Sequence, residues 1–167
     1  MLFTLMITAC VGQAGQDKTA KAVGETESEL ENMEDRITSG IVIETEADKD
    51  IELHLTLGDT PVEVQWEDNE SVKAIRELTS SSGLEINMSM YGGFEQVGPI
   101  GQSIPRNDEQ TTTKAGDIVL YSGNQIVVFY GSNSWSYTRL GKITDKTEQE
   151  LTEMLGNGDV VLKFEVN

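Results

Sequence analysis

The sequence predicts a mainly β protein, a closed β-barrel with two short helices covering its ends. Segments in which apolar and polar residues alternate recur between residues 51 and 166, as expected for strands with one buried face. Turns that contain glycine separate many of these segments. The two helix-like segments lie far apart, so the chain lacks the strand–helix–strand rhythm of a parallel sheet.

The first expected strand covers residues 51–57, where apolar residues alternate with polar ones. A turn at 58–61 follows, in which proline restricts the backbone, and residues 62–66 alternate again. This pattern predicts a hairpin. His54, the only histidine, lies on the polar face of its strand and is expected to be exposed, so no Ser-His-Asp triad can be argued.

Two helices are expected. The first begins after Asp68 or Asn69, either of which can act as an N-cap. The second begins with a capping box formed by Asp145 and Glu148 and ends at Gly156. Apolar residues recur every three or four positions in both segments, which predicts that each helix packs one face on the barrel.

The remaining strands are expected before and after a long irregular region. Residues 84–90 alternate, and this places both Met88 and Met90 in the core. Residues 91–113 contain glycines and prolines and predict loops with at most a short strand. Residues 160–166 form the final strand.

The segment 116–143 carries the clearest hairpin. Its two β-branched runs flank a turn at Ser122–Asn124, where glycine and asparagine tolerate positive φ. The sequence SWSY at 134–137 then predicts an aromatic loop, followed by a short closing strand. Two large aromatic residues in a loop indicate a surface that touches another molecule, although they could equally plug one end of the barrel.

The composition excludes several functions. The chain has 167 residues, of which 37% are hydrophobic, and a formal net charge of −17. Such acidity argues against nucleic acid and against docking on an anionic membrane through charge. Cys10 is the only cysteine, so an internal disulfide and a cysteine-based metal site are both excluded. We expect neither a metal nor a cofactor.

The N-terminal segment resembles a bacterial lipoprotein signal. Residues 2–9 are mainly apolar, and Ile7-Thr8-Ala9-Cys10 is similar to a lipobox. The resemblance implies that residues 1–9 are a partial signal peptide and that Cys10 carries the lipid. The protein would then be extracytoplasmic and anchored to the bacterial cell membrane through this lipid alone. A buried N-terminal strand is the alternative.

Residues 10–40 are polar and acidic and predict a flexible tether after the lipidated cysteine. A short helix at 29–37 is the alternative for part of it. The barrel domain is expected to cover residues 41–167, with a first edge strand at 41–43.

Several residues and two long motifs between residues 50 and 167 carry a resemblance to a known family. They are Trp66, Asp68, Asn69, residues 88–98 (MSMYGGFEQVG), Pro105 and residues 116–143. In these residues the chain resembles the bacterial cyclophilin-like proteins. These are closed barrels related to peptidyl-prolyl isomerases, often without an assigned activity, and several look like exported lipoproteins. The similarity therefore implies a cyclophilin-like β-barrel.

Cyclophilins isomerise X-Pro bonds with an arginine, a glutamine, a histidine and an apolar wall. By resemblance Gln125 takes the place of the glutamine, Val127 that of a wall phenylalanine and Tyr137 that of the histidine. The strand at 86–91 contains no arginine. We therefore expect no catalytic residues and a binding function, with a weak or specialised prolyl isomerase as the alternative. A third possibility is a domain that only interacts within a larger surface assembly.

The expected ligand is a small molecule or an extended peptide. Its pocket is predicted where the segments YGGFEQVG and NSWSYTRLG meet across one open end of the barrel. Aromatic side chains would supply apolar area, and Glu95, Gln125 and Arg139 would orient the ligand. The candidate residues are Tyr91, Phe94, Glu95, Gln125, Trp135, Tyr137 and Arg139.

Overall fold

The computed structural model describes residues 52–167. Within this range ten strands and two helices follow one another. The strands are β1 (Leu53–Leu57), β2 (Thr60–Val62), β3 (Val64–Trp66), β4 (Leu84–Tyr91), β5 (Glu95–Pro99), β6 (Glu109–Thr112), β7 (Asp117–Tyr121), β8 (Gln125–Phe129), β9 (Ser134–Ile143) and β10 (Val160–Val166). The helices are α1 (Glu70–Ser82) and α2 (Glu148–Leu155).

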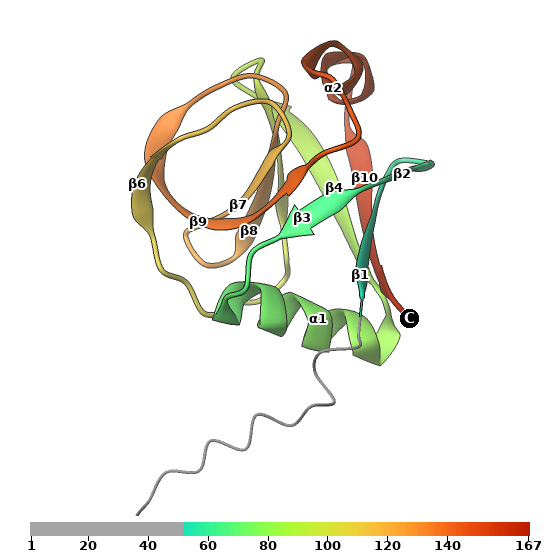
Figure 1. Ribbon diagram of the computed structural model, residues 1–167, viewed down its shortest axis with the longest axis vertical. Helices are drawn as coiled ribbons and strands as arrows, with labels where there is room; N and C mark the ends of the chain where they lie inside the picture. Colours follow the sequence, from blue (N-terminus) through green and yellow to red (C-terminus); the bar gives the residue numbers. More distant parts are fainter. Residues whose placement is uncertain (1–51) are drawn as a thin grey trace, which may run out of the picture. The chain divides into compact units, whose positions relative to one another are not determined.

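The strands form one antiparallel sheet that closes almost completely into a barrel (Figure 1). The order is β2-β1-β10-β4-β5-β8-β7-β9-β3, with β6 paired to β9 beside this path. The strands β2 and β3 stand at the two ends of the path, yet only Glu63 separates them in the chain. Helices α1 and α2 lie at opposite ends of the barrel. The predicted closed barrel with two short helices is confirmed.

Apolar side chains from alternate strand positions fill the barrel. In β1 the three leucines are buried while His54 is exposed, as the alternation predicts. Burying a side chain of this size stabilises the fold by about 1.5–3 kcal/mol. Fully or almost fully buried members of this core include Leu55, Ile75, Ile86, Met88, Ile118, Leu120, Ile126, Leu140, Leu151 and Phe164.

The helices begin at residues that cap them. Asn69 accepts a hydrogen bond from the backbone N–H of Val72 at 3.0 Å, which confirms one of the two predicted caps of α1. The predicted cap of α2 is wrong, because the capping box consists of Thr147 and Glu150. Asp145 instead accepts the backbone N–H of Glu63 at 3.0 Å, between β2 and β3.

Two strands, β5 and β6, lie in the region predicted as loops. The segment at 134–137, predicted as an aromatic loop, is the first part of β9 and pairs with β6, with Trp135 opposite Thr111. The core position predicted for Met90 is also wrong, since this side chain is 45% exposed. The pairing of β10 with β4 ends opposite Met88, so β4 runs past the barrel core beyond that residue.

Two residues of β5, Gln96 and Gly98, make close contacts with α2 and β4. The fully buried Gln96 side chain donates from Nε2 to the backbone oxygens of Leu155 and Gly158, at 2.6 and 2.7 Å. These bonds tie the end of α2 to the sheet. Gly98 is buried two residues further on, where a Cβ would lie 2.5 Å from the side chain of Met88.

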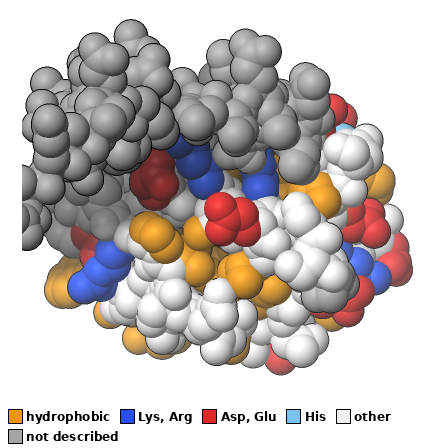
Figure 2. Space-filling view, turned by 90° about the horizontal axis from the view of Figure 1, so that it is seen from below, with side chains coloured by type: hydrophobic (Ala, Val, Ile, Leu, Met, Phe, Trp, Pro, Cys, Tyr) orange, Lys and Arg blue, Asp and Glu red, His pale blue; other side chains and the backbone are white. Residues whose placement is uncertain are grey.

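The predicted signal segment, Cys10, the tether and the edge strand at 41–43 lie outside the described residues. In residues 52–167 no helix has the length and apolar character needed to cross a membrane. Figure 2 shows the face at the α1 end, where hydrophobic, acidic and other side chains intermix and Lys and Arg occur at separate places.

Candidate functional site

The wall formed by β7, β8 and β9 buries apolar side chains on both of its faces. Ile118 and Leu120 belong to the barrel core, whereas Val119 between them belongs to a second cluster. Successive residues of a strand face opposite sides of the sheet, so this second cluster lies on the outer face of the barrel. Its buried members are Val119, Val127, Phe129 and Tyr137.

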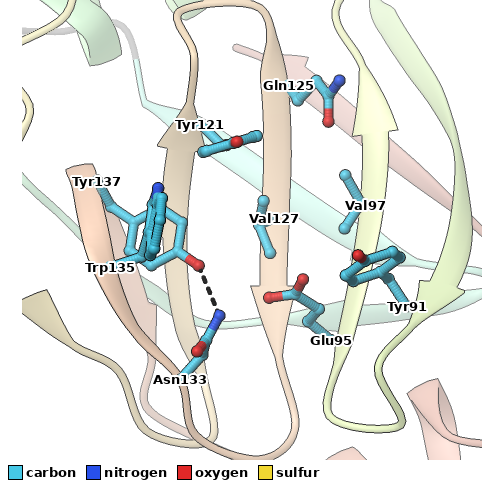
Figure 3. A pocket seen from close by; sticks show the side chains of 9 residues that line it. All are labelled: Tyr91, Glu95, Val97, Tyr121, Gln125, Val127, Asn133, Trp135 and Tyr137. Carbon is cyan, nitrogen blue, oxygen red and sulfur yellow. Dashed lines mark hydrogen bonds between the residues drawn. The ribbon is translucent and has the colours of Figure 1, made fainter.

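A cavity of about 350 Å³ lies on this outer face (Figure 3). Pockets of this size accommodate small organic ligands. Its wall draws on β4, β5, β7, β8, β9 and the loop before β9. The lining residues are Tyr91, Glu95, Val97, Tyr121, Gln125, Val127, Asn133, Trp135 and Tyr137.

Strand register brings these residues together. Tyr91 pairs with Glu95 across β4 and β5, and Val97 pairs with Val127 across β5 and β8. Directly paired residues of antiparallel strands project from the same face of the sheet. Neighbouring residues on adjacent strands therefore line the cavity side by side.

Aromatic rings form both the floor and the rim. Tyr137 is 4% exposed and packs edge-on against Phe129 and Tyr121, with ring centroids 5.7 and 6.0 Å apart. The side-chain amide of Asn133 donates to the Tyr137 hydroxyl at 3.0 Å and fixes the ring further. Trp135 is 58% exposed, although tryptophan normally buries most of its large surface. The site thus combines a rigid aromatic floor with an accessible aromatic rim.

Glu95 places a carboxyl group inside this cavity. The residue is 6% exposed, and its Oε2 is buried without a hydrogen-bond partner among the described residues. Burial raises the pKa of Glu95 to about 7, because desolvation disfavours the charged form. Burial, followed by the charge of Glu95, also raises the pKa of Tyr137, and the Asn133 hydrogen bond opposes this shift. Glu95 can therefore act as a hydrogen-bond donor or as an anion near neutral pH.

A second buried carboxylate, Asp117, is fully used within the fold. It accepts the backbone N–H of Lys114 at 2.9 Å and so caps the turn before β7. It also contacts the ammonium of Lys142 at 3.4 Å and the guanidinium of Arg139 at 3.8 Å. This cluster holds the start of β7 against β9.

The structure brings five of the seven candidate residues into one cavity wall: Tyr91, Glu95, Gln125, Trp135 and Tyr137. Arg139 lies outside it, beside Asp117. Phe94 also lies outside it, and its side chain packs against the second cluster. The two predicted segments do meet, but on the outer face of the barrel and not at an open end.

Four lining residues were not among the predicted candidates: Val97, Tyr121, Val127 and Asn133. Tyr121 ends β7 directly opposite Gln125, so the register of the predicted hairpin could have identified it. Val97 required knowledge of β5, which lies in the region predicted as loops with at most a short strand. Asn133 acts through its bond to Tyr137, and no sequence pattern signals such a contact.

Within residues 52–167 no three His, Cys, Asp or Glu residues lie close enough together to hold a metal ion. The functional groups that line the cavity are four aromatic rings, three of which carry a hydroxyl group, the amides of Gln125 and Asn133, and the carboxyl group of Glu95.

Comparison with known proteins agrees with this architecture. A model of the cyclophilin-like family matches residues 55–165, which span almost the whole barrel. The chain belongs to the cyclophilin-like family. No curated protein and no solved structure gives a significant match.

Within this cyclophilin-like domain, the residues that resemble the isomerase glutamine, wall and histidine do lie together. Gln125, Val127 and Tyr137 all line the cavity. Lys and Arg are missing among its nine lining residues, all of them in the described part of the chain. Glu95 contributes the one carboxyl group among the nine lining residues of this cavity.

Proposed function

We propose that this cyclophilin-like domain binds a small molecule or an extended peptide in the outer-face cavity. The main support for this proposal is the exposed aromatic rim, formed by Tyr91 and Trp135, above a buried floor that contains Tyr137. Aromatic side chains lose little conformational freedom on binding and offer large apolar area. Gln125 and Glu95 would orient polar groups of the ligand.

A weak or specialised prolyl isomerase is the second candidate, supported by the position of Gln125 in the wall. Cyclophilin chemistry also uses a cationic donor to the proline amide, and preorganised donors of this kind supply much of the rate in enzymes. The cavity wall has no such cation among its nine residues, all within the described range. Binding without turnover is therefore our first choice.

A blocked Ala-Ala-Pro-Phe peptide tests both binding and isomerisation. A panel of small aromatic fragments tests binding alone. We expect amide shifts of the cavity strands in NMR titrations of the full chain with at least one of these probes. Trp135→Ala should weaken binding by about fivefold or more, because it removes the larger of the two rings of the rim. The peptide should show no accelerated isomerisation in a protease-coupled assay.

Val128→Ala is the control, because Val128 is fully buried in the barrel core on the opposite face of β8. It should cost about 1–3 kcal/mol of stability and leave binding unchanged. Loss of folding in Trp135→Ala, with no probe bound by the wild type, would instead identify Trp135 as a packing element. Rapid isomerisation would make the enzyme the first choice.

We also propose that the domain is a membrane-tethered, extracytoplasmic lipoprotein. Support comes from the lipobox-like Ile7-Thr8-Ala9-Cys10 and the acidic segment that follows it. Expressed in bacteria behind a lipoprotein signal that ends at Ala9, the chain should incorporate labelled palmitate and sediment with membranes. Cys10→Ala should abolish the label, and a label that persists in this variant would contradict the proposal.

A further inference from the structure

Glu95 offers a carboxyl group that forms no ion pair with any residue in the described range 52–167. Its Oε2 is buried and has no hydrogen-bond partner among the described residues. Arg139, one of the predicted orienting residues, pairs with Asp117 instead, as does Lys142. A buried carboxyl group is costly unless a donor or a positive charge reaches it. The missing partner can come from a ligand, because Glu95 lines an open cavity.

The side chains around Glu95 suit a positive charge. Four of the nine lining residues are aromatic, and the negative face of an aromatic ring attracts cations. Figure 3 shows Tyr91, Tyr121, Trp135 and Tyr137 on both sides of the space into which the Glu95 carboxylate points. Aromatic rings with one carboxylate form an established arrangement for binding ammonium groups in proteins.

The other lining residues carry no charge that would repel a cation or pair with Glu95. Gln125 and Asn133 are neutral amides, and Val97 and Val127 are apolar. The net charge of −17 for the whole chain also attracts cations and repels anions at long range. An anionic ligand would therefore meet both the field of the protein and the carboxylate of Glu95.

We propose that the outer-face cavity binds its ligand through a cationic nitrogen, which pairs with Glu95 and lies against the aromatic rings. This inference rests on the proposed binding function and specifies its ligand class. Two sources share this chemistry, a small organic ammonium compound and the lysine side chain of an extended peptide. The cavity volume of about 350 Å³ accommodates either group.

The experiment compares each cation with an uncharged isostere, by calorimetric titration of the full chain at pH 8. Choline is matched with 3,3-dimethyl-1-butanol, and acetyl-Ala-Lys-Ala-amide with the norleucine peptide. The cation of at least one pair should bind about tenfold tighter than its isostere, as a charge-assisted contact in a desolvated site predicts. The pair that shows the difference identifies the source.

Glu95→Gln should reduce the affinity for that cation by about tenfold and change the affinity for the isostere by less than about twofold. Glu165→Gln makes the same chemical change at an exposed position on β10 and should alter neither affinity. A folded Glu95→Gln variant is verified by its unfolding curve before titration.

Equal affinities for a cation and its isostere would overturn the cation proposal and leave the proposed binding function standing. The same holds if Glu95→Gln binds the cation as tightly as the wild type. If no member of either pair binds, the cation proposal also fails. The binding function itself fails only if the proline peptide and the aromatic fragments do not bind either.

Discussion

Replacing Gly98 by valine is expected to lower the free energy of unfolding by about 3 kcal/mol or more. A Cβ at this position would lie 2.5 Å from Cγ2 of Ile86 and from Sδ of Met88. It would also lie 2.8 Å from the backbone oxygen of Asn87, which cannot move without distorting β4. Overpacking of this kind typically costs about 1–3 kcal/mol, and valine adds two further methyl groups.

Urea unfolding followed by circular dichroism measures this effect, and Gly98→Ala should give an intermediate value. Gly101→Ala serves as the control, since no atom lies within 4 Å of a Cβ there and only its positive φ opposes alanine. Its cost should stay near 1 kcal/mol. If Gly98→Val unfolds at the same urea concentration as the wild type, β4 and β5 are not as closely packed as the structure indicates.

Replacing Glu95 by glutamine is expected to stabilise the domain by about 2–3 kcal/mol at pH 8 and to change little at pH 4. Burial raises the pKa of Glu95 from 4.5 to about 7. Between these values the folded protein retains a proton that the unfolded chain has released, so the free energy of unfolding falls as the pH rises. Above pH 7 the penalty is complete, at about 1.4 kcal/mol for each pKa unit before solvent in the open cavity reduces it.

The residues around Glu95 do not reverse the expected fall of the free energy of unfolding with rising pH. Tyr91 faces it from β4, Tyr121 from β7 and Tyr137 from β9, while β8 contributes no charged group to the cavity. Raised pKa values keep Tyr137 neutral throughout the range from pH 4 to 8.

Urea unfolding of wild type and Glu95→Gln at pH 4, 6 and 8 measures the effect. The difference between the two proteins should grow through the window from about pH 4.5 to 7. Glu165→Gln, at an exposed position, should differ from the wild type by less than about 0.5 kcal/mol at every pH. A pH-independent difference for Glu95→Gln would mean that the carboxyl group is not desolvated.

The barrel and its helices could be predicted because alternation and turn chemistry act locally. Strand β1, helix α1 and strand β10 each carry a clear period, and Asn69 is a strong cap. Strand β6 carries no such signal, since EQTT is polar throughout and its strand pairing with β9 holds it in place. The residues SWSY in β9 do alternate, but serines on both sides made a loop the more natural interpretation.

The candidate site could be predicted in part for a related reason. Trp135 stands out in sequence because it lies among small polar residues, and Tyr91 because two glycines follow it. The outer-face position did not follow, because it depends on which face of β8 points inward, and β7 and β8 are apolar on both faces. The pairing of Arg139 with Asp117, which places this arginine outside the cavity, is revealed only by the folded structure.

The insertion of β10 between β1 and β4 also governs how quickly the barrel can assemble. Leu53 pairs with Val166, and Leu84 pairs with Phe164. The last strand must therefore find partners that lie far away in the sequence while the chain folds. Loop closure over such separations costs entropy before any contact compensates for it. Proteins dominated by distant pairings fold in milliseconds to seconds, and helical bundles of similar stability fold far faster. The hairpin of β7 and β8 makes only local contacts, whereas the barrel closes only when residues 160–166 pair with β1 and β4.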